Sequence, residues 1–270
     1  MVVPADYVSS AITGFIIALA SWLPIGPEGA AVSHFIGTAI VNYTDYVVPS
    51  YLGVIFAVLF YFRDLIAVGT QKALRKNFSA EARYFAYASL FTLAIGYPIA
   101  AGGWNVLNPR ASDAVSAIIG AAILLVGILC WRGKSAPLEG MDRKLGDEDE
   151  PTLLDGISSG VAQGLAMFGE LSATGLVLLV LSAGGIKPRK ALELLFMISP
   201  VYLILRLLLL REWTPVMPVY LPFTAFLSSF VTAILFMKAL LFAGEKLRRR
   251  TFLTLMGLVP IVVYLLEVVA

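Results

Sequence analysis

Six long apolar stretches constrain this chain more than any other feature of its sequence. They cover residues 44–62, 84–102, 113–131, 191–210, 219–243 and 251–269. Each has the roughly 18–20 apolar residues that an α-helix needs to cross a hydrocarbon core about 30 Å thick. Strands of a membrane β-barrel alternate apolar and polar residues, and these stretches do not. The sequence therefore predicts an all-α integral membrane protein with six transmembrane helices.

Composition agrees with a chain whose main solvent is lipid. Hydrophobic residues make up 59% and charged residues 14%, against about 45–50% and 25% in soluble domains. The single cysteine, Cys130, excludes an intrachain disulfide, and with one histidine in the chain no Cys/His metal site is expected. A net charge of +2 gives no reason to expect a nucleic-acid partner.

Two further apolar stretches are interrupted, the first at a segment with proline and glycine and the second at a segment with glycine. Residues 6–41 are broken at 24–29, and residues 156–184 are broken at 168–175. Each half is only about 13–18 residues long, which is too short to cross the hydrocarbon core alone. Irregular backbone at membrane depth survives only when protein buries it or when it lines a polar cavity. We therefore predict two re-entrant helical hairpins.

Lysine and arginine give the predicted orientation. Sixteen of the twenty lie in four segments: 63–83, 132–155, 185–190 and 244–250. Threading six spans and two re-entrant hairpins in order places all four segments on one side, which the positive-inside rule assigns to the cytoplasm. The prediction is a multi-pass protein of the plasma membrane with both termini outside.

The two halves of the chain follow the same plan. Residues 1–131 hold the first hairpin and three spans, residues 156–270 hold the second hairpin and three spans, and residues 132–155 form a cytoplasmic linker. An odd number of spans per unit inverts the second copy. The segments 14–20 and 160–166 also agree at Gly, Leu and Ala. We predict an inverted-topology repeat, in which a binding site lies between the two copies.

The candidate site residues lie at and near the two breaks. Glu28 and Glu170 sit at the two tips, where ionisable groups in membrane segments indicate function. They could bind a cation or a proton, hold a metal that bridges to phosphate, or cap the half-helices. Ser172 and Thr174 could donate to phosphate oxygens, and Ser172 could act as a nucleophile with Glu170 as its base.

Two more polar residues are candidates. His34 could carry a proton or bind phosphate, or it could be a packing residue. Arg206 lies inside a predicted span, where it could pair with a phosphate, pair with a carboxylate such as Glu193, or extend to the membrane surface. The residues alone leave these alternatives open.

Three segments resemble the undecaprenyl-diphosphate phosphatase (bacitracin-resistance) family. Residues 22–29, WLPIGPEG, resemble its first signature loop, and residues 160–175, GVAQGLAMFGELSATG, resemble its second. Residues 185–193, GIKPRKALE, resemble the segment after that loop. The resemblance covers the whole chain and implies six spans, two re-entrant hairpins and a polyprenyl phosphate or diphosphate ligand.

The departures from the family pattern fall where its chemistry is expected. The resemblance leads us to expect two glutamates on the first half-helix, where this chain has Ile17 and Ser21. It also leads us to expect a histidine at Ala30 and an arginine at Ala173. Two carboxylates can hold a divalent metal and an arginine can grip phosphate, but the residues present cannot.

Some other positions match the family pattern and some do not. A serine of the first loop aligns with Gly26 or Pro27, whereas Gln163 and Glu193 match the family pattern. Taken with the residues above, the predicted substrate-binding set is Glu28, Gly29, His34, Gln163, Glu170, Ser172, Thr174 and Arg206. The catalytic candidates are Glu28, Glu170 and Ser172, and no metal ligands are assigned.

These observations favour a protein that handles polyprenyl-phosphate lipid carriers. Translocation of the carrier is the first hypothesis, because the broken helices are kept and the expected catalytic residues are missing. The alternative is a polyprenyl diphosphate phosphatase with a rearranged site, which could use a divalent cation such as Mg²⁺ or Ca²⁺; no cofactor is assigned. A small-solute or ion transporter on the same scaffold is a third hypothesis. The expected partners are the carrier and membrane lipids, and a homodimer stays open.

Overall fold

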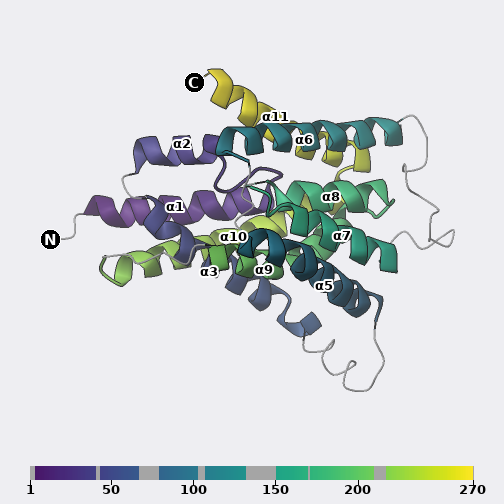
Figure 1. The fold of residues 1–270 in the computed structure, drawn as a ribbon, viewed down its shortest axis with the longest axis horizontal. Coiled ribbons are helices and arrows are strands. Elements are labelled where there is room, and N and C mark those ends of the chain that lie inside the picture. The colour runs from purple at the N-terminus through teal and green to yellow at the C-terminus, as the bar shows by residue number, and fades with distance from the viewer. Residues whose placement is uncertain are drawn as a thin grey trace.

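The computed structural model describes residues 4–40, 43–66, 79–102, 107–131, 150–169, 171–209 and 217–269, and within these ranges every regular element is helical. The first half contains α1 (Pro4–Trp22), α2 (Ala30–Ala39), the 3₁₀ helix η1 (Tyr43–Tyr46), α3 (Val47–Tyr61), α5 (Ala80–Ala101) and α6 (Pro109–Trp131). The second contains α7 (Leu153–Leu165), α8 (Ala173–Ala183), α9 (Pro188–Leu209), α10 (Tyr220–Lys246) and α11 (Arg249–Val269) (Figure 1). The all-α prediction is confirmed.

Six helices in the described ranges are long and apolar enough to cross a membrane. They cover Tyr43–Tyr61, Ala80–Ala101, Pro109–Leu129, Pro188–Leu208, Tyr220–Lys246 and Arg249–Val269. Each overlaps one of the six predicted spans and differs from it by a few residues at the ends. The fold is therefore that of a multi-pass helical membrane protein.

The two interrupted stretches are broken as predicted. Residues 23–29 separate α1 from α2, and residues 166–172 separate α7 from α8. The second break ends earlier than the predicted 168–175, because Ser172 is the N-cap of α8. Its Oγ accepts a hydrogen bond from the amide of Gly175 at 2.9 Å, which satisfies one of the unpaired N–H groups of the first turn. Whether the two helix pairs re-enter the membrane stays a prediction.

Small residues let the helices pack closely. A Cβ atom on Gly14 of α1 would collide with the carbonyl oxygen of Ala225 on α10. A Cβ atom on Gly160 of α7 would collide in the same way with the carbonyl oxygen of Ala88 on α5. Close backbone approach at small residues is typical of helix pairs in membranes, where lipid is as apolar as the side chains.

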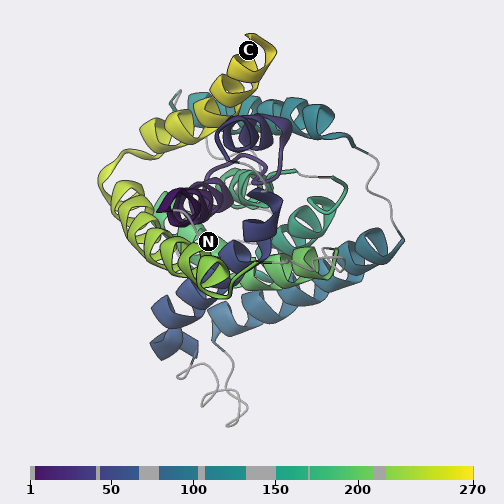
Figure 2. The same ribbon diagram turned by 90° about the vertical axis from the view of Figure 1, so that its left-hand side faces the viewer.

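Helix α1 lies on the inner side of longer helices. In Figure 2, α1 lies within an outline formed by α10, α11 and α6. Trp22 ends α1, is 1% exposed, and packs edge to face against Phe196 of α9, with ring centroids 4.8 Å apart. This contact fixes the start of the first break beside α9.

Helix ends next to the basic segments lie together. Lys190 at the start of α9 pairs with Glu81 of α5 at 3.1 Å, and Arg189 pairs with Glu245 of α10 at 2.5 Å. Arg249 of α11 donates to the carbonyl of Ser182 on α8 at 2.6 Å. This clustering is the arrangement expected if the basic segments share one side of the membrane. The assignment of that side to the cytoplasm stays a prediction.

Candidate functional site

A buried arginine joins the two breaks. Arg206 lies in the last turn of α9 and is 4% exposed. Its Nη2 donates to Glu28 Oε2 at 3.1 Å and its Nε donates to Glu28 Oε1 at 3.3 Å. Its Nη1 donates to the carbonyl oxygen of Gly169 at 2.9 Å. Glu28 belongs to the first break and Gly169 to the second, so one guanidinium holds both.

The partly buried Glu28 carboxylate has a third donor. The Tyr51 hydroxyl, on α3, donates to Glu28 Oε1 at 2.5 Å. The Glu28 side chain is 17% exposed and the Arg206 side chain is 5% exposed. A charge is stable in such a place only when it is paired and its remaining lone pairs are satisfied. The two-point contact of the guanidinium with the carboxylate, together with Tyr51, meets that requirement.

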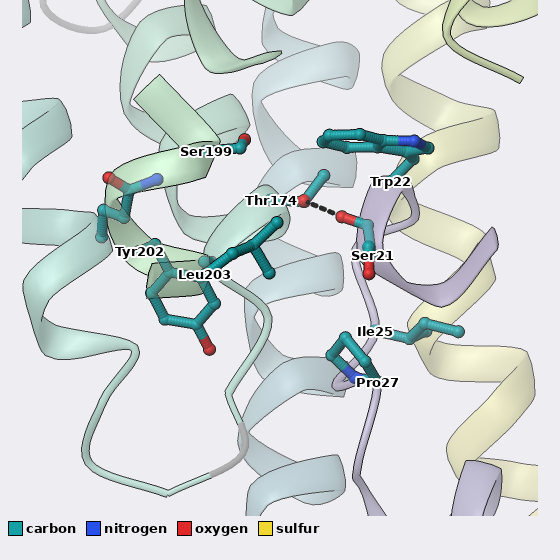
Figure 3. Close-up of a pocket in the computed structure, with 10 residues that line it drawn as sticks. Ser21, Trp22, Ile25, Pro27, Thr174, Ser199, Tyr202 and Leu203 are labelled. Carbon is teal, nitrogen blue, oxygen red and sulfur yellow. Dashed lines mark hydrogen bonds between the residues drawn. The ribbon is translucent and has the colours of Figure 1, made fainter. Parts of the chain in front are cut away.

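Hydroxyl groups at and next to the second break bond to backbone carbonyls at and next to the first. Thr174 Oγ1 donates to the carbonyl of Ser21 at 2.7 Å (Figure 3), and Ser172 Oγ donates to the carbonyl of Leu23 at 3.4 Å. Ser172 Oγ also accepts from the amide of Gly175. Both predicted phosphate donors are therefore engaged in holding the backbone. The prediction that they contact phosphate is compatible with this structure only if these bonds open.

A small cavity lies between the breaks. Its volume is about 20 Å³, which is space for about one water molecule. Gln163 lines it, and its Oε1 accepts from Thr92 Oγ1 at 2.9 Å. Figure 3 shows the other lining side chains that it labels: Ser21, Trp22, Ile25, Pro27, Thr174, Ser199, Tyr202 and Leu203. A diphosphate headgroup would fit only after the breaks move apart.

A second, more open cavity lies at the N-terminal ends of α2 and α6. Its volume is about 390 Å³. It is lined by Ala30, Ser33, Asn108, Pro109 and Arg110, and the Arg110 side chain is 87% exposed. Ser33 Oγ donates to the carbonyl of Glu28 at 3.1 Å. This cavity therefore adjoins the tip that carries Glu28.

The resemblance leads us to expect catalytic groups at four positions. In the structure these positions hold residues that belong to the helices and their packing. Ile17 is fully buried, and Ser21 Oγ donates to the Ile17 carbonyl at 2.7 Å within α1. Ala30 and Ala173 are the first residues of α2 and α8. No group of three or more His, Cys, Asp and Glu side chains that could hold a metal is found in the described ranges. Ile17, Ala30 and Ala173 therefore supply no metal ligand at these positions.

The remaining predicted residues lie in different surroundings. His34 is exposed on α2, packs against Phe35 with ring centroids 6.2 Å apart, and lines neither cavity. Glu170 lies outside the described residues. Glu193 pairs with Arg189 at 3.2 Å near the start of α9 and is not the partner of Arg206.

Two residues that the sequence did not single out belong to the site. Tyr51 gave no signal, because a tyrosine in an apolar stretch is ordinary. Asp113 had a signal, since it is an acidic residue at the first position of the predicted span 113–131, and acidic residues are unusual in membrane segments. Asp113 Oδ2 accepts from the amide of Ala31 at 2.8 Å, and its carboxylate occupies the space that a Cβ atom on Gly29 would need. Gly29 is the N-cap of α2. Because it has no side chain, the Asp113 carboxylate of α6 can approach the start of α2.

A family model described as bacitracin resistance protein BacA matches residues 10–262. This range includes both breaks, five of the six candidate spans in the described residues, and the first part of the sixth, Arg249–Val269. No curated protein matches the chain.

Proposed function

The chain belongs to the bacitracin resistance protein BacA family, and on that premise we propose that it binds a polyprenyl-phosphate lipid carrier where its two helix breaks meet. We further propose that it translocates the carrier and does not hydrolyse it. The observation that carries the proposal is the Arg206 guanidinium, which bonds to Glu28 of one break and Gly169 of the other.

Arg206 supplies the chemistry for the headgroup. A guanidinium presents its N–H groups as a planar fork that matches both carboxylate and phosphate. In this structure the fork holds Glu28. A phosphate would compete for the same donors and release Glu28. Because Arg206 also holds Gly169, this exchange would loosen the contact between the breaks, as translocation through a closed site requires.

Missing groups favour translocation over hydrolysis. Hydrolysis of a diphosphate needs a nucleophile or an activated water and cationic clamps on the developing charge. Ile17 and Ser21 supply no carboxylate, and Ala173 supplies no guanidinium. The Ser172 hydroxyl caps α8 and contacts the Leu23 carbonyl, so the described contacts give it no base.

An inverted repeat would place this site between two moving halves. The proposed units are residues 1–131 and 156–270, joined by 132–155. The packing supports the proposal because corresponding helices pair: α1 lies on α10 as α7 lies on α5, and α2 contacts α11 as α8 contacts α6. The glycines that the repeat aligns, Gly14 and Gly160, both face an alanine carbonyl of the partner helix.

The second candidate is a polyprenyl diphosphate phosphatase, and family membership favours it. In such an enzyme Arg206 would be the cationic clamp, and Glu28, once released from it, would serve as a base or would hold Mg²⁺ or Ca²⁺. The plasma membrane, with both termini outside, is the proposed location for either function.

The test uses purified protein reconstituted in vesicles with a fluorescent polyprenyl phosphate. Translocation is measured as the loss of protection of the inner-leaflet fluorophore from a membrane-impermeant quencher. The double variant E28Q/R206Q removes both charges without leaving one unpaired, and we expect it to abolish translocation. R63Q changes an exposed arginine at the end of α3 and is the matched control, which should keep the wild-type rate.

Phosphate release from a polyprenyl diphosphate, with and without Mg²⁺ or Ca²⁺, is measured in parallel. We expect none above the vesicle background. Phosphate release that requires a divalent cation and is lost in E28Q/R206Q would show that the protein hydrolyses the diphosphate, and it would overturn the translocation proposal. If E28Q/R206Q translocated the carrier at the wild-type rate, Arg206 and Glu28 would not belong to the carrier-binding site.

A further inference from the structure

A line of buried polar side chains follows α7 where it packs on α5. Asp155, Ser159 and Gln163 recur every four residues, so they share one face of α7, and they are 7%, 0% and 1% exposed. On α5, Tyr84 packs against the first turn of α7, and Thr92 Oγ1 donates to Gln163 Oε1 at 2.9 Å. The α5–α7 seam is the contact that contains these five side chains. Polar groups inside membrane helices are expensive to bury and mark the routes of polar substrates.

Two hydroxyl groups of the α5–α7 seam lack a hydrogen bond. They belong to Tyr84 and Ser159, both are buried, and no partner among the described residues reaches them. An unpaired buried polar group costs free energy, and ordered water is the usual partner when protein supplies none. The seam is therefore unsatisfied in its part nearer the N-terminal end of α7.

The contact of α1 with α10 is a matched comparison inside the same molecule. Thr13 precedes the packing glycine of α1 as Ser159 precedes that of α7, and Thr13 Oγ1 donates to the carbonyl one turn earlier at 2.9 Å. Ser10 Oγ donates to the Leu221 carbonyl of α10 at 2.5 Å, and Ser228 Oγ of α10 donates to a carbonyl of α1 at 2.7 Å. All three hydroxyl groups are satisfied, and two of the bonds cross between the helices.

This difference decides which contact opens to water more easily. The α5–α7 seam is closed here, since a Cβ atom on Gly160 would collide with the Ala88 carbonyl. When α5 and α7 separate, water supplies the hydrogen bonds that Tyr84 and Ser159 lack. Separation of α1 from α10 would instead break two bonds that already exist. We propose that the α5–α7 seam opens to water and forms a polar path from the N-terminal end of α7 to the small cavity between the breaks.

The ends of this path fit a route for the headgroup. One end is the first turn of α7, where Thr152 and Asp155 form a capping box, and the other is Gln163, which lines the small cavity. The open cavity of about 390 Å³ lies beside α2. In Figure 1, α2 is at the left of the molecule and α5 and α7 are at the right. The path and the open cavity would thus give the headgroup polar access from opposite ends, and this step of the inference rests on the proposed function.

The path is tested by the reaction of introduced cysteines with a negatively charged methanethiosulfonate, which reacts in water and does not enter apolar regions. Cys130, the single cysteine of the sequence, is first replaced by alanine. S159C and T13C are then added separately, at positions that are both 0% exposed, and labelling of the purified proteins is followed by mass spectrometry. We expect S159C to react about tenfold faster than T13C, which is the factor that one satisfied buried polar group is worth.

A second change separates this mechanism from loose packing. Y84F removes one unpaired hydroxyl, so the closed seam loses no hydrogen bond while the open seam loses a bond to water. Added to S159C, Y84F should slow labelling about tenfold and leave Tm unchanged or raised. Equal rates for S159C and T13C, or an S159C rate that Y84F does not slow, would overturn the inference. If either cysteine variant fails to fold, A88C and A225C repeat the comparison, because both alanines are 0% exposed and each faces one of the two packing glycines.

The path and the proposed function are separated by adding E28Q/R206Q to S159C. These two charges lie outside the seam, so S159C should still react faster than T13C. Polyprenyl phosphate should protect S159C when Arg206 and Glu28 are present, and should not protect it in the double variant. If the carrier protected neither protein, the headgroup would not use the path, although the fast labelling of S159C would still show that water does.

Discussion

The ion pair between Arg206 and Glu28 can be measured by a double-mutant cycle. At 3.1 Å and an effective dielectric constant of about 20, the Coulomb attraction is roughly 5 kcal/mol. Desolvation of both ions offsets much of this attraction, but removing only one partner leaves the other charge buried and unpaired, which costs about 3–5 kcal/mol. We therefore expect R206Q and E28Q each to lose stability of that order.

The double variant distinguishes this reasoning from a simple loss of contacts. E28Q/R206Q buries no unpaired charge, so it should be more stable than either single variant. In thermal unfolding in detergent, each single variant should lower Tm by roughly 6–20 °C, using about 2–4 °C per kcal/mol. The double variant should recover at least half of that loss.

The control cycle lies on the same helix. Arg189 and Glu193 of α9 pair at 3.2 Å with side chains 51% and 31% exposed. Solvent screens such a pair, so its removal should hardly change Tm. If the losses in R206Q and E28Q simply add in the double variant, the two charges do not depend on each other, and the account of the site is wrong.

Two further predictions concern packing and capping. G14A and G160A should each destabilise the protein by about 1–3 kcal/mol, because the new methyl group collides with a backbone carbonyl of the neighbouring helix. G37A, whose methyl group would meet only the Tyr43 ring at 3.6 Å, should leave the thermal midpoint unchanged or slightly raised, and equal midpoints for all three would contradict the packing. S172A should cost about 1 kcal/mol and speed amide hydrogen exchange in the first turn of α8, because Gly175 loses its acceptor. S158A, at a serine that is not an N-cap, should leave that exchange unchanged.

The sequence by itself determined the spans and the breaks. A helix must carry about 20 apolar residues to cross lipid, so the six spans could be predicted to within a few residues. Proline and glycine marked the first break and glycine marked the second, because neither residue supports a regular helix interior. Both predictions depend only on local chain properties, which neighbouring helices do not alter.

Only the tertiary structure decided which side chains meet. Arg206 and Glu28 are 178 residues apart. The sequence left Arg206 three alternatives: a phosphate, a carboxylate such as Glu193, or the membrane surface. The choice depends on how α9 is rotated against α1 and α3, and packing sets that rotation. For the same reason His34, six residues after Glu28, points outward while Asp113 reaches the start of α2. A helix surrounded by both lipid and protein is apolar on all sides, so its apolar periodicity is weak. The sequence therefore does not indicate which face of the helix packs against the rest of the protein.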